Sequence, residues 1–468
     1  MFPFYFFPKF AFQARFGPST ETSSRQPATP AQGRWHPANK EEGLRSYRPG
    51  GLCPIDIGDC LVERYRVLHK LAWVPNGPSQ YTSWVARDMK SSKVVQLDVF
   101  LSRTSSGVAV RRPEFVFKSF LMSLDASESR FFQKALTEHW INSPNGRHYC
   151  RVLELGFVNS DMWNEMLNDD GGYTVHKARR QALSLSSGVA LLHEHGYIHG
   201  DICTRNIVFT AFQLRYLSNG EVGRLLGEPK TVSTTGYIGE TGESADTGQV
   251  PRYTQLELDP TDVMKLDHVA VIKAFPPTLK NHFYASRRWT SNSSPEHIFG
   301  KSMMYFPSDD VWAVGCVIFE LVTGVNPFPK LTEASALSNF QGTLGAIPGY
   351  LQRRWNIPKE AHDEEYSKRE LRRSIRDRLR EREYAHPDGN LPLAGTNQAD
   401  AVPCHEERNS IKQKATKVTT RPLLSDEEYE LIADLLEQIL IYDSEKRPTM
   451  SEVLKHPWFE RMEKRKRY

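Results

Sequence analysis

The sequence predicts an α+β protein that forms one large two-lobed unit with a tail at each end. Its 468 residues, 39% of them hydrophobic, suffice for a sizeable core. The sequence predicts a β-strand at residues 94–100 and a second one where Val269 and Val271 alternate. Residues 173–195 instead carry an apolar stripe at helical spacing, which predicts a long helix packed on a core.

A short polar loop follows this helix and carries an acid and an amide at a characteristic spacing. Asp201 stands two residues after His199, and Asn206 stands five residues after Asp201. The pattern resembles the catalytic loop of protein kinases, in which the acid accepts a proton from the substrate hydroxyl and the amide holds magnesium. Arg205 can supply the positive charge that Cys203 does not, as in the loop of tyrosine kinases. The alternative interpretation is an ordinary polar turn.

Two further elements are more specific than this loop. The first is the opening Tyr47–Gly51, which continues through residues 55–59 and 64–71. The second is Ser143–His148, which leads into residues 150–156. Both closely resemble the SR-protein kinases, and especially their fungal relatives.

The resemblance covers about residues 47–460 and implies the two-lobed protein-kinase fold. A small β-rich N-lobe would span residues 47–156, and a larger helical C-lobe would span residues 157–460. ATP and magnesium are the implied cofactors. By position in the family's motifs, the implied site residues are Asp201 and Arg205 for catalysis, Asn206 and Asp267 for the metal, and Leu71, Gly77, Asp98, Glu154 and Leu155 for the nucleotide.

The segment that should cover the phosphates departs from the family pattern. A glycine-rich loop works because its bare backbone approaches the nucleotide closely. Here Ala72 and Val74 stand at glycine positions, and about four inserted residues bring Pro75 and Pro78. Side chains block close approach and each proline removes an N–H donor, so this phosphate cradle is expected to be weakened.

The strand that should carry the nucleotide-binding lysine has an acid instead. Val94–Phe100 aligns on the Val-Ala-x-Lys strand, and Asp98 stands where the lysine would hold the phosphates. An anion there adds repulsion where the family has attraction. Lys93 is five residues away and is not expected to reach the site. The helix predicted at residues 112–121 offers Glu114, which would repel Asp98 rather than pair with it.

The acid that should follow the next strand and bind magnesium has three alternative registers. Registered on the strand, the triplet is Lys273–Phe275; registered on the following Phe-Pro-Pro, it is Ala270–Ile272. Neither triplet contains an acid. The register Asp267–Val269 keeps one, at the cost of several extra residues afterwards.

The C-lobe motifs are better preserved. By resemblance, Asp310 hydrogen-bonds the backbone of the catalytic loop, and Glu296 and Arg447 form the buried ion pair of the fold. His193 and His195 are interpreted as ordinary helix-end residues. Gly200 replaces the arginine that precedes the acid in most kinases, which argues against control through a phosphorylated activation loop.

The remaining segments are expected to lie outside the core. Residues 1–46 are interpreted as a disordered tail, with a targeting segment as the alternative, and residues 461–468 as a basic tail. An insertion at about residues 215–255 is expected to be a surface loop. A second insertion, at about residues 358–420, holds a run of mixed charges at 360–384. That run predicts a solvated helix or a docking surface for acidic partners.

Composition limits the kinds of partner and the cellular compartment that we expect for this protein. A net charge of +4 does not suggest a nucleic-acid surface, and no apolar run reaches the length of a membrane helix. The six cysteines show neither metal-ligand nor disulfide spacing, which favours a reduced cytoplasmic or nuclear protein.

Two functional hypotheses follow, together with one about the sequence itself. The first is an SR-kinase-like pseudokinase, or strongly impaired kinase, that acts as a binding scaffold. The alternative is an active ATP-dependent serine/threonine kinase that phosphorylates Ser/Arg-rich proteins of mRNA processing, with Asp267 on magnesium and a lysine from elsewhere. The third possibility is a gene-model error near residues 74–78 or 266–275.

Overall fold

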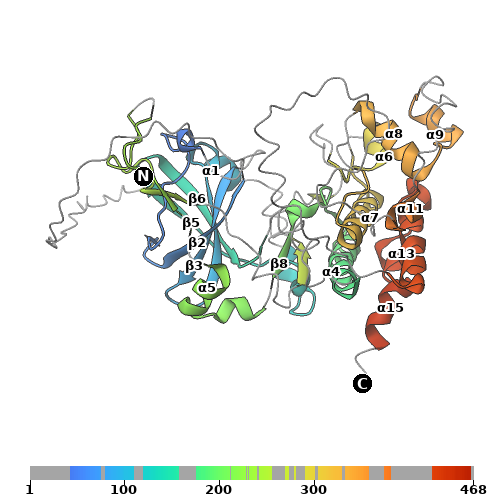
Figure 1. The fold of residues 1–468 in the computed structure, drawn as a ribbon, viewed down its shortest axis with the longest axis horizontal. Helices are drawn as coiled ribbons and strands as arrows, with labels where there is room; N and C mark the ends of the chain where they lie inside the picture. The colour runs from blue at the N-terminus through green and yellow to red at the C-terminus, as the bar shows by residue number, and fades with distance from the viewer. Residues whose placement is uncertain are drawn as a thin grey trace, which may run out of the picture. The chain divides into compact units, whose positions relative to one another are not determined.

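The computed structural model describes fifteen stretches of the chain (Figure 1). They are residues 43–74, 80–109, 120–157, 175–210, 212–227, 229, 231–239, 242–255, 269–272, 279–280, 290–300, 304–328, 333–357, 374–380 and 424–464. Gly77, Glu114 and Asp267 lie outside them, as do nearly all of the predicted N-terminal tail and most of the helix predicted at 112–121. The expectations for those positions therefore remain predictions.

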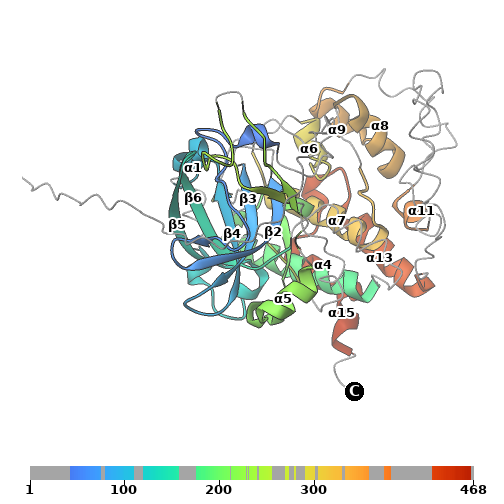
Figure 2. The ribbon, with the colours of Figure 1, turned by 60° about the vertical axis from the view of Figure 1, so that its left-hand side comes forward.

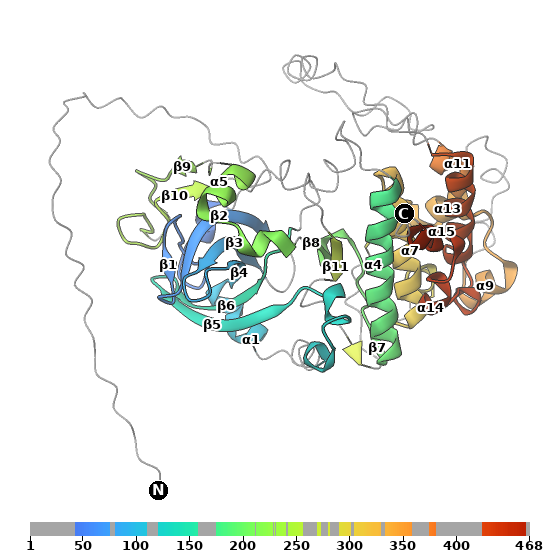
Figure 3. The same ribbon diagram turned by 90° about the horizontal axis from the view of Figure 1, so that it is seen from below.

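A six-stranded sheet forms the first part of the fold, and all of its neighbouring strands are antiparallel (Figure 3). The strand order is β1-β2-β3-β4-β6-β5. The bounds are β1 Cys60–Leu61, β2 Tyr65–Val74, β3 Tyr81–Asp88, β4 Val94–Phe100, β5 Ala135–Ser143 and β6 Gly146–Glu154. Helix α1, Ser102–Ala109, follows β4 and packs beside β6. The predicted strand at 94–100 is confirmed.

The two faces of this sheet differ in chemistry, although both are buried at β3, β4 and most of β6. Trp84, Leu97 and Val152 pair across β3, β4 and β6 and belong to an apolar cluster on one face. Side chains alternate along a strand, so the neighbouring residues point to the other face. That second face carries the register partners Ser83, Asp98 and Arg151, which are polar or charged.

Helices build the second part of the fold around a large apolar core. Helix α4, Val175–Glu194, lies beside α7, Pro307–Thr323, and both contribute many buried side chains (Figure 2). The other helices are α6 Pro295–Ile298, α8 Glu333–Leu344, α9 Gly349–Arg354, α11 Ile375–Arg380, α13 Asp426–Ile439, α14 Met450–Val453 and α15 Pro457–Lys464. The predicted helix at 173–195 is confirmed within two residues. Among the described residues, no helix combines the length and apolar character of a membrane span.

The described residues also contain three two-stranded sheets and five short 3₁₀ helices. The strand pairs are β7 Tyr197–Ile198 with β12 Leu279–Lys280, β8 Ile207–Thr210 with β11 Val269–Ile272, and β9 Thr231–Ser233 with β10 Tyr253–Gln255. The 3₁₀ helices are η1 Leu44–Ser46, η2 Ser129–Phe131, η3 Thr204–Asn206, η4 Phe212–Tyr216 and η8 Ser444–Lys446. The strand predicted from the alternation of Val269 and Val271 is confirmed.

The insertion at 215–255 is not the surface loop that composition predicts. It contains helix α5, Asn219–Leu226, and the β9–β10 ribbon. Ser218 and Glu221 form a capping box that starts α5, and Val222 and Leu226 are buried. The insertion therefore folds because a short amphipathic helix within it finds an apolar surface.

The described piece of the charged run is also packed rather than solvated. Ile375 and Leu379, four residues apart on α11, are buried. Arg376 bonds Glu430 and Glu437 of α13 at 2.5 and 2.9 Å. The run thus contains two apolar residues at i and i+4 that pack on the core, and its Arg376 forms ion pairs within the same chain.

Candidate functional site

The polar loop at 199–206 connects β7 to β8, and hydrogen bonds to α7 fix its backbone. The carboxylate of Asp310, fully buried in the first turn of α7, accepts the N–H of His199 at 2.7 Å and that of Gly200 at 2.8 Å. The predicted role of Asp310 is confirmed. His193 also reaches this carboxylate, with Nε2 2.9 Å from Oδ2, so it is more than a helix-end residue. His195 bonds the carbonyl of Leu191, as a helix-end residue would.

Asp201 and Asn206 are brought together by this loop. Asn206 Nδ2 donates to both the carbonyl and the carboxylate Oδ2 of Asp201, each at 2.8 Å. Cys203 Sγ lies 3.6 Å from Asp201 Oδ1. Arg205 is part of η3, but its side chain lies outside the described atoms, so its role stays a prediction. Within the described stretches, no group of three or more His, Cys, Asp or Glu side chains is placed to hold a metal.

Gly200 is a structural requirement of the loop. Its φ of 74° lies in the left-handed region, and a Cβ there would come within 3.3 Å of the Tyr305 ring. Burial, and then the nearby charge of Asp201, raise the pKa of Tyr305 to about 12. Tyr305 therefore packs as a neutral phenol against the loop, a neighbour that no sequence motif indicates.

A second set of polar residues holds the other side of the loop. Asn292 donates to the carbonyl of Ile202 at 3.0 Å, and Asn326 donates to Asn292 at 2.7 Å. Burial raises the pKa of Glu320 to about 7, against a hydrogen bond from Asn326. These residues lie far apart in the sequence, which is why reading the chain could not group them.

The strand pairing beside the loop helps to choose among the three registers for the magnesium-binding acid. Ile272, the last residue of β11, pairs with Ile207, which directly follows Asn206, whereas Val269 pairs with Thr210. Strand β11 therefore ends opposite the residue that follows Asn206. Ala270–Ile272 lies inside the strand, and both Asp267 and Lys273–Phe275 lie outside the described residues.

Asp98 lies on the polar face of the six-stranded sheet, on the inner strand β4. Asp98 is fully buried. Its Oδ1 accepts Ser83 Oγ at 2.7 Å and Gln96 Nε2 at 2.9 Å, while Oδ2 lies 3.9 Å from the Arg151 guanidinium. Arg151 also stacks over the Phe100 ring at 4.5 Å. The acid is thus enclosed by partners from its own chain.

This network continues to the end of β6. Gln133 Nε2 donates to Gln96 Oε1 at 3.0 Å and to the carbonyl of Glu154 at 2.9 Å. Gln96 Oε1 also accepts the Gly156 N–H at 3.3 Å. A Cβ on Gly156 would lie 3.1 Å from Val208 of β8. Two backbone groups of this connecting segment are therefore occupied by glutamine side chains.

Three other predicted nucleotide residues, those that the structure describes, are also in contact with the protein itself. Leu71 and Leu155 are buried in the large apolar core. Glu154 pairs with Arg215 at 2.6 Å; burial raises the pKa of Glu154, and Arg215 opposes that shift. Leu71, Asp98, Glu154 and Leu155 thus lie in the buried part of the molecule.

The buried ion pair of the C-terminal part is present. Arg447, whose side chain is fully buried, bonds both carboxylate oxygens of Glu296 at 2.5 and 2.8 Å and stacks over Trp312 at 4.9 Å. The sequence prediction for this pair is confirmed.

Comparisons with known proteins agree with this arrangement. The protein kinase domain family model matches residues 273–459. The serine/threonine-protein kinase SRPK of Physarum polycephalum is 23% identical over 294 residues, 61% of this chain and 66% of that protein. The dual specificity protein kinase CLK4 of Mus musculus is 21% identical over 319 residues, 68% of this chain and 52% of that protein. The chain carries a protein kinase domain related to the SRPK and CLK kinases.

A solved structure supports the kinase fold. The crystal structure of a kinase domain superposes with a TM-score of 0.52 at 17% identity, over 87% of this chain and 98% of that one. The predicted two-lobed α+β kinase fold is therefore confirmed. The chain spans less than two thirds of the length of the SRPK and CLK4 relatives.

In the kinase fold, Asp98 stands at the position of the nucleotide-binding lysine. The cation beside it belongs to an adjacent strand. Lys70 is fully buried, but it pairs with Trp84 and so belongs to the face opposite Asp98. Lys93 places its ammonium 5.8 Å over the ring of Tyr216. Arg151, the register partner of Asp98, is the cation that the structure places at this point.

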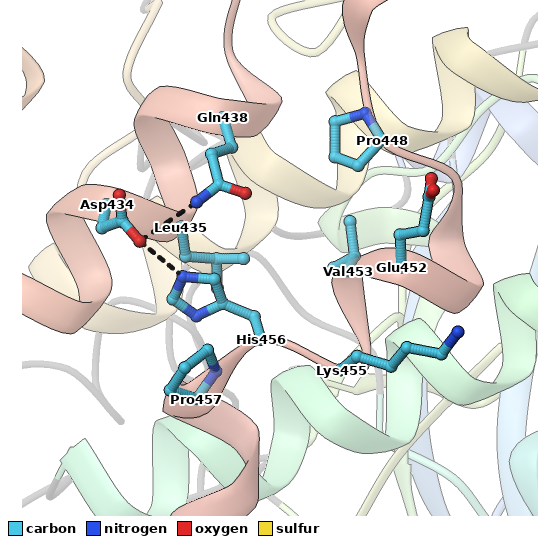
Figure 4. Close-up of a pocket in the computed structure, with 9 residues that line it drawn as sticks. All are labelled: Asp434, Leu435, Gln438, Pro448, Glu452, Val453, Lys455, His456 and Pro457. Atoms are coloured by element: carbon cyan, nitrogen blue, oxygen red, sulfur yellow. Dashed lines mark hydrogen bonds and ion pairs between the residues drawn. The ribbon is translucent and has the colours of Figure 1, made fainter.

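A shallow pocket lies elsewhere on the kinase domain, between α13 and α14, with a volume of about 270 Å³ (Figure 4). His456 Nε2 lies 2.9 Å from Asp434 Oδ2, which also accepts Gln438 Nε2 at 3.0 Å. The hydrogen bond to His456 is the main cause of the lowered pKa of Asp434. None of the predicted site residues lines this pocket.

Proposed function

We propose that this SRPK-like kinase domain is a pseudokinase, or a strongly impaired kinase, that acts as a protein-binding scaffold. The observation that carries the proposal is the enclosure of Asp98. At the position of the nucleotide-binding lysine stands a fully buried acid, hydrogen-bonded by Ser83 and Gln96 and facing Arg151.

Electrostatics supports the loss of phosphoryl transfer. ATP brings several negative charges, and a carboxylate at the lysine position repels them. Removing a single preorganised charge-stabilising group typically costs about 10²–10³-fold in rate. Here the lysine is replaced, and two glycine positions of the phosphate loop are Ala72 and Val74.

The register of β11 supports a third loss. Because β11 ends with Ile272 opposite Ile207, the residue after Asn206, we assign the metal-binding triplet to Lys273–Phe275, which follows in the sequence and contains no acid. Asp267 precedes the strand and is the weaker assignment. ATP and magnesium, which protein kinases generally use, would therefore be held weakly or not at all.

The scaffold half of the proposal rests on what is retained. Asp310 holds the catalytic loop, and the Glu296–Arg447 pair joins α6 to the chain before α14. A protein surface can thus persist after nucleotide chemistry is lost. The relatives' names indicate kinases acting on protein substrates, and we propose a protein partner, with Ser/Arg-rich proteins as the first candidates. A cytoplasmic or nuclear location fits such a partner.

The competing function is an active kinase for Ser/Arg-rich proteins, and one observation favours it. Asn206 and Asp201 are hydrogen-bonded to each other in a loop that α7 holds in place. That machinery would serve a substrate hydroxyl if metal and nucleotide reached it.

Phosphate transfer to a Ser/Arg-rich protein separates the two functions. The purified full chain and its Asp201→Asn variant would be incubated with radiolabelled Mg-ATP and an Arg-Ser repeat protein, with a CLK kinase as the positive control. We expect no incorporation above the Asp201→Asn background. Robust incorporation that Asp201→Asn abolishes would reject the pseudokinase.

A further inference from the structure

Three segments that lie far apart in the sequence meet at one point of the fold. They are the opening segment at 47–52, the Ser143–His148 turn between β5 and β6, and residues 249–253 at the end of the insertion. Asn145, which is 1% exposed, belongs to the turn and bonds to both of the other segments. Nothing in the proposed function uses this meeting point.

Asn145 binds two distant backbone segments at once. Its Nδ2 donates to the carbonyl of Leu52 at 2.8 Å and to that of Gln249 at 2.7 Å, while its backbone carbonyl accepts the Gly50 N–H at 2.7 Å. These bonds cross 93 and 104 residues of sequence. A buried amide with both of its N–H groups so used holds its neighbours in one geometry.

The turn that presents Asn145 is itself fixed. Ser143 Oγ bonds His148 Nε2 at 2.8 Å, and His148 Nδ1 bonds the carbonyl of Phe100 at 2.9 Å. Gly146 has a φ of 124°, and a Cβ there would lie 2.2 Å from Ser102 Oγ, so the turn requires glycine.

Apolar packing closes the same junction. A small core cluster contains Tyr47 and Leu52 from the opening, Leu101 from the end of β4, and Val250 from the insertion. Trp73 and Tyr237 pack against it. Arg252 adds a pair with Asp56 at 2.9 Å. The end of the insertion is therefore bound to the N-lobe by buried apolar surface as well as by hydrogen bonds.

The beginning of the insertion is bound to the N-lobe as well. Arg215 pairs with Glu154 of β6, and the side-chain oxygen of Asn219 accepts two bonds from Arg87 of β3, at 3.0 and 2.8 Å. Figures 1 and 3 show α5 beside the strands of the sheet. In the sequence, however, the insertion lies between β8 and β11. These two strands pair with each other next to the catalytic loop.

We propose that residues 212–255 form a strap that ties the catalytic hairpin β8–β11 to the N-lobe, with Asn145 as its latch. The strap fixes the contact between the two parts without any ligand. In the described chain, the junction between the two parts is marked by the mutual backbone hydrogen bonds of Phe157, the first residue after the N-lobe, and Phe209 of β8, at 3.0 Å each. This inference does not depend on whether nucleotide binds.

Hydrogen exchange of the ligand-free full chain tests the strap. Asn145→Ala removes both latch bonds, and Asn142→Ala is the matched control, because Asn142 is exposed on the same hairpin. We expect Asn145→Ala to speed exchange of the Phe157 and Phe209 amides about tenfold, since they open only when the two parts separate. Asn142→Ala should leave both amides at the native rate.

The result that overturns the strap is faster exchange confined to residues 43–53 and 231–255, with Phe157 and Phe209 unchanged. If Asn145→Ala does not fold, Val250→Ala carries the same test, because it loosens the apolar side of the junction. Unchanged exchange at Phe157 and Phe209 in Val250→Ala, despite faster exchange within the insertion, would equally reject the proposal.

Discussion

Asp98→Lys, the substitution that restores the residue expected of an active kinase, is expected to destabilise this protein by about 3–5 kcal/mol. Breaking a buried ion pair by removing one partner has a cost of that size, and the new ammonium would also face Arg151. Ser83 and Gln96 would lose their shared acceptor. Denaturant unfolding of the full chain, followed by tryptophan fluorescence, measures the change.

Two further variants separate charge from shape. Asp98→Asn keeps an acceptor for Ser83 and removes only the charge, so we expect a smaller loss, about 1–3 kcal/mol. The double variant Asp98→Lys with Arg151→Met should recover part of the loss, because it relieves the repulsion. An Asp98→Lys protein as stable as the wild type would show that Asp98 is not enclosed as described.

Glu296→Ala is expected to cost about 3–5 kcal/mol of unfolding free energy, because it leaves a buried guanidinium without its carboxylate. Arg447 would keep only carbonyl acceptors, those of Ser308, Ile441 and Tyr442. Thermal and denaturant unfolding provide the measurement, followed by the near-ultraviolet circular dichroism of the aromatic side chains in the helical part.

An exposed ion pair of the same kind serves as the control. Arg354 and Glu445 are 3.5 Å apart, with side chains 64% and 77% exposed. Solvent screens such a pair, so Glu445→Ala should leave the unfolding midpoint unchanged within error. If Glu296→Ala and Glu445→Ala shifted the midpoint equally, the buried pair would not stabilise the fold in this way.

The parts predictable from sequence were those with a local signal or a motif. The strand at 94–100, the helix at 173–195 and the loop from His199 to Asn206 each carry their pattern within a few turns of chain. Asp310 and the Glu296–Arg447 pair could be predicted because the family's motifs fix both partners.

Contacts between distant segments could not be predicted in the same way. Asp98 was found by its motif position, but its partners Ser83 and Arg151 come from neighbouring strands, and a strand register is a tertiary property. Gln133 and Tyr305 reach the site only through the folded chain. The insertion offered one local signal, the Ser218–Glu221 capping spacing, which composition alone concealed.

The most direct test of the central claim, that the nucleotide side of this kinase domain is closed by its own side chains, is a thermal shift of the full chain with ATP. A ligand at 100 times its dissociation constant stabilises the folded state by about 2.7 kcal/mol, which raises the melting temperature by a few degrees. A CLK kinase domain under the same conditions is the positive control. We predict no shift at millimolar ATP, with or without magnesium. A magnesium-dependent rise of several degrees would contradict the account, because it would require a nucleotide pocket that accepts both metal and phosphates.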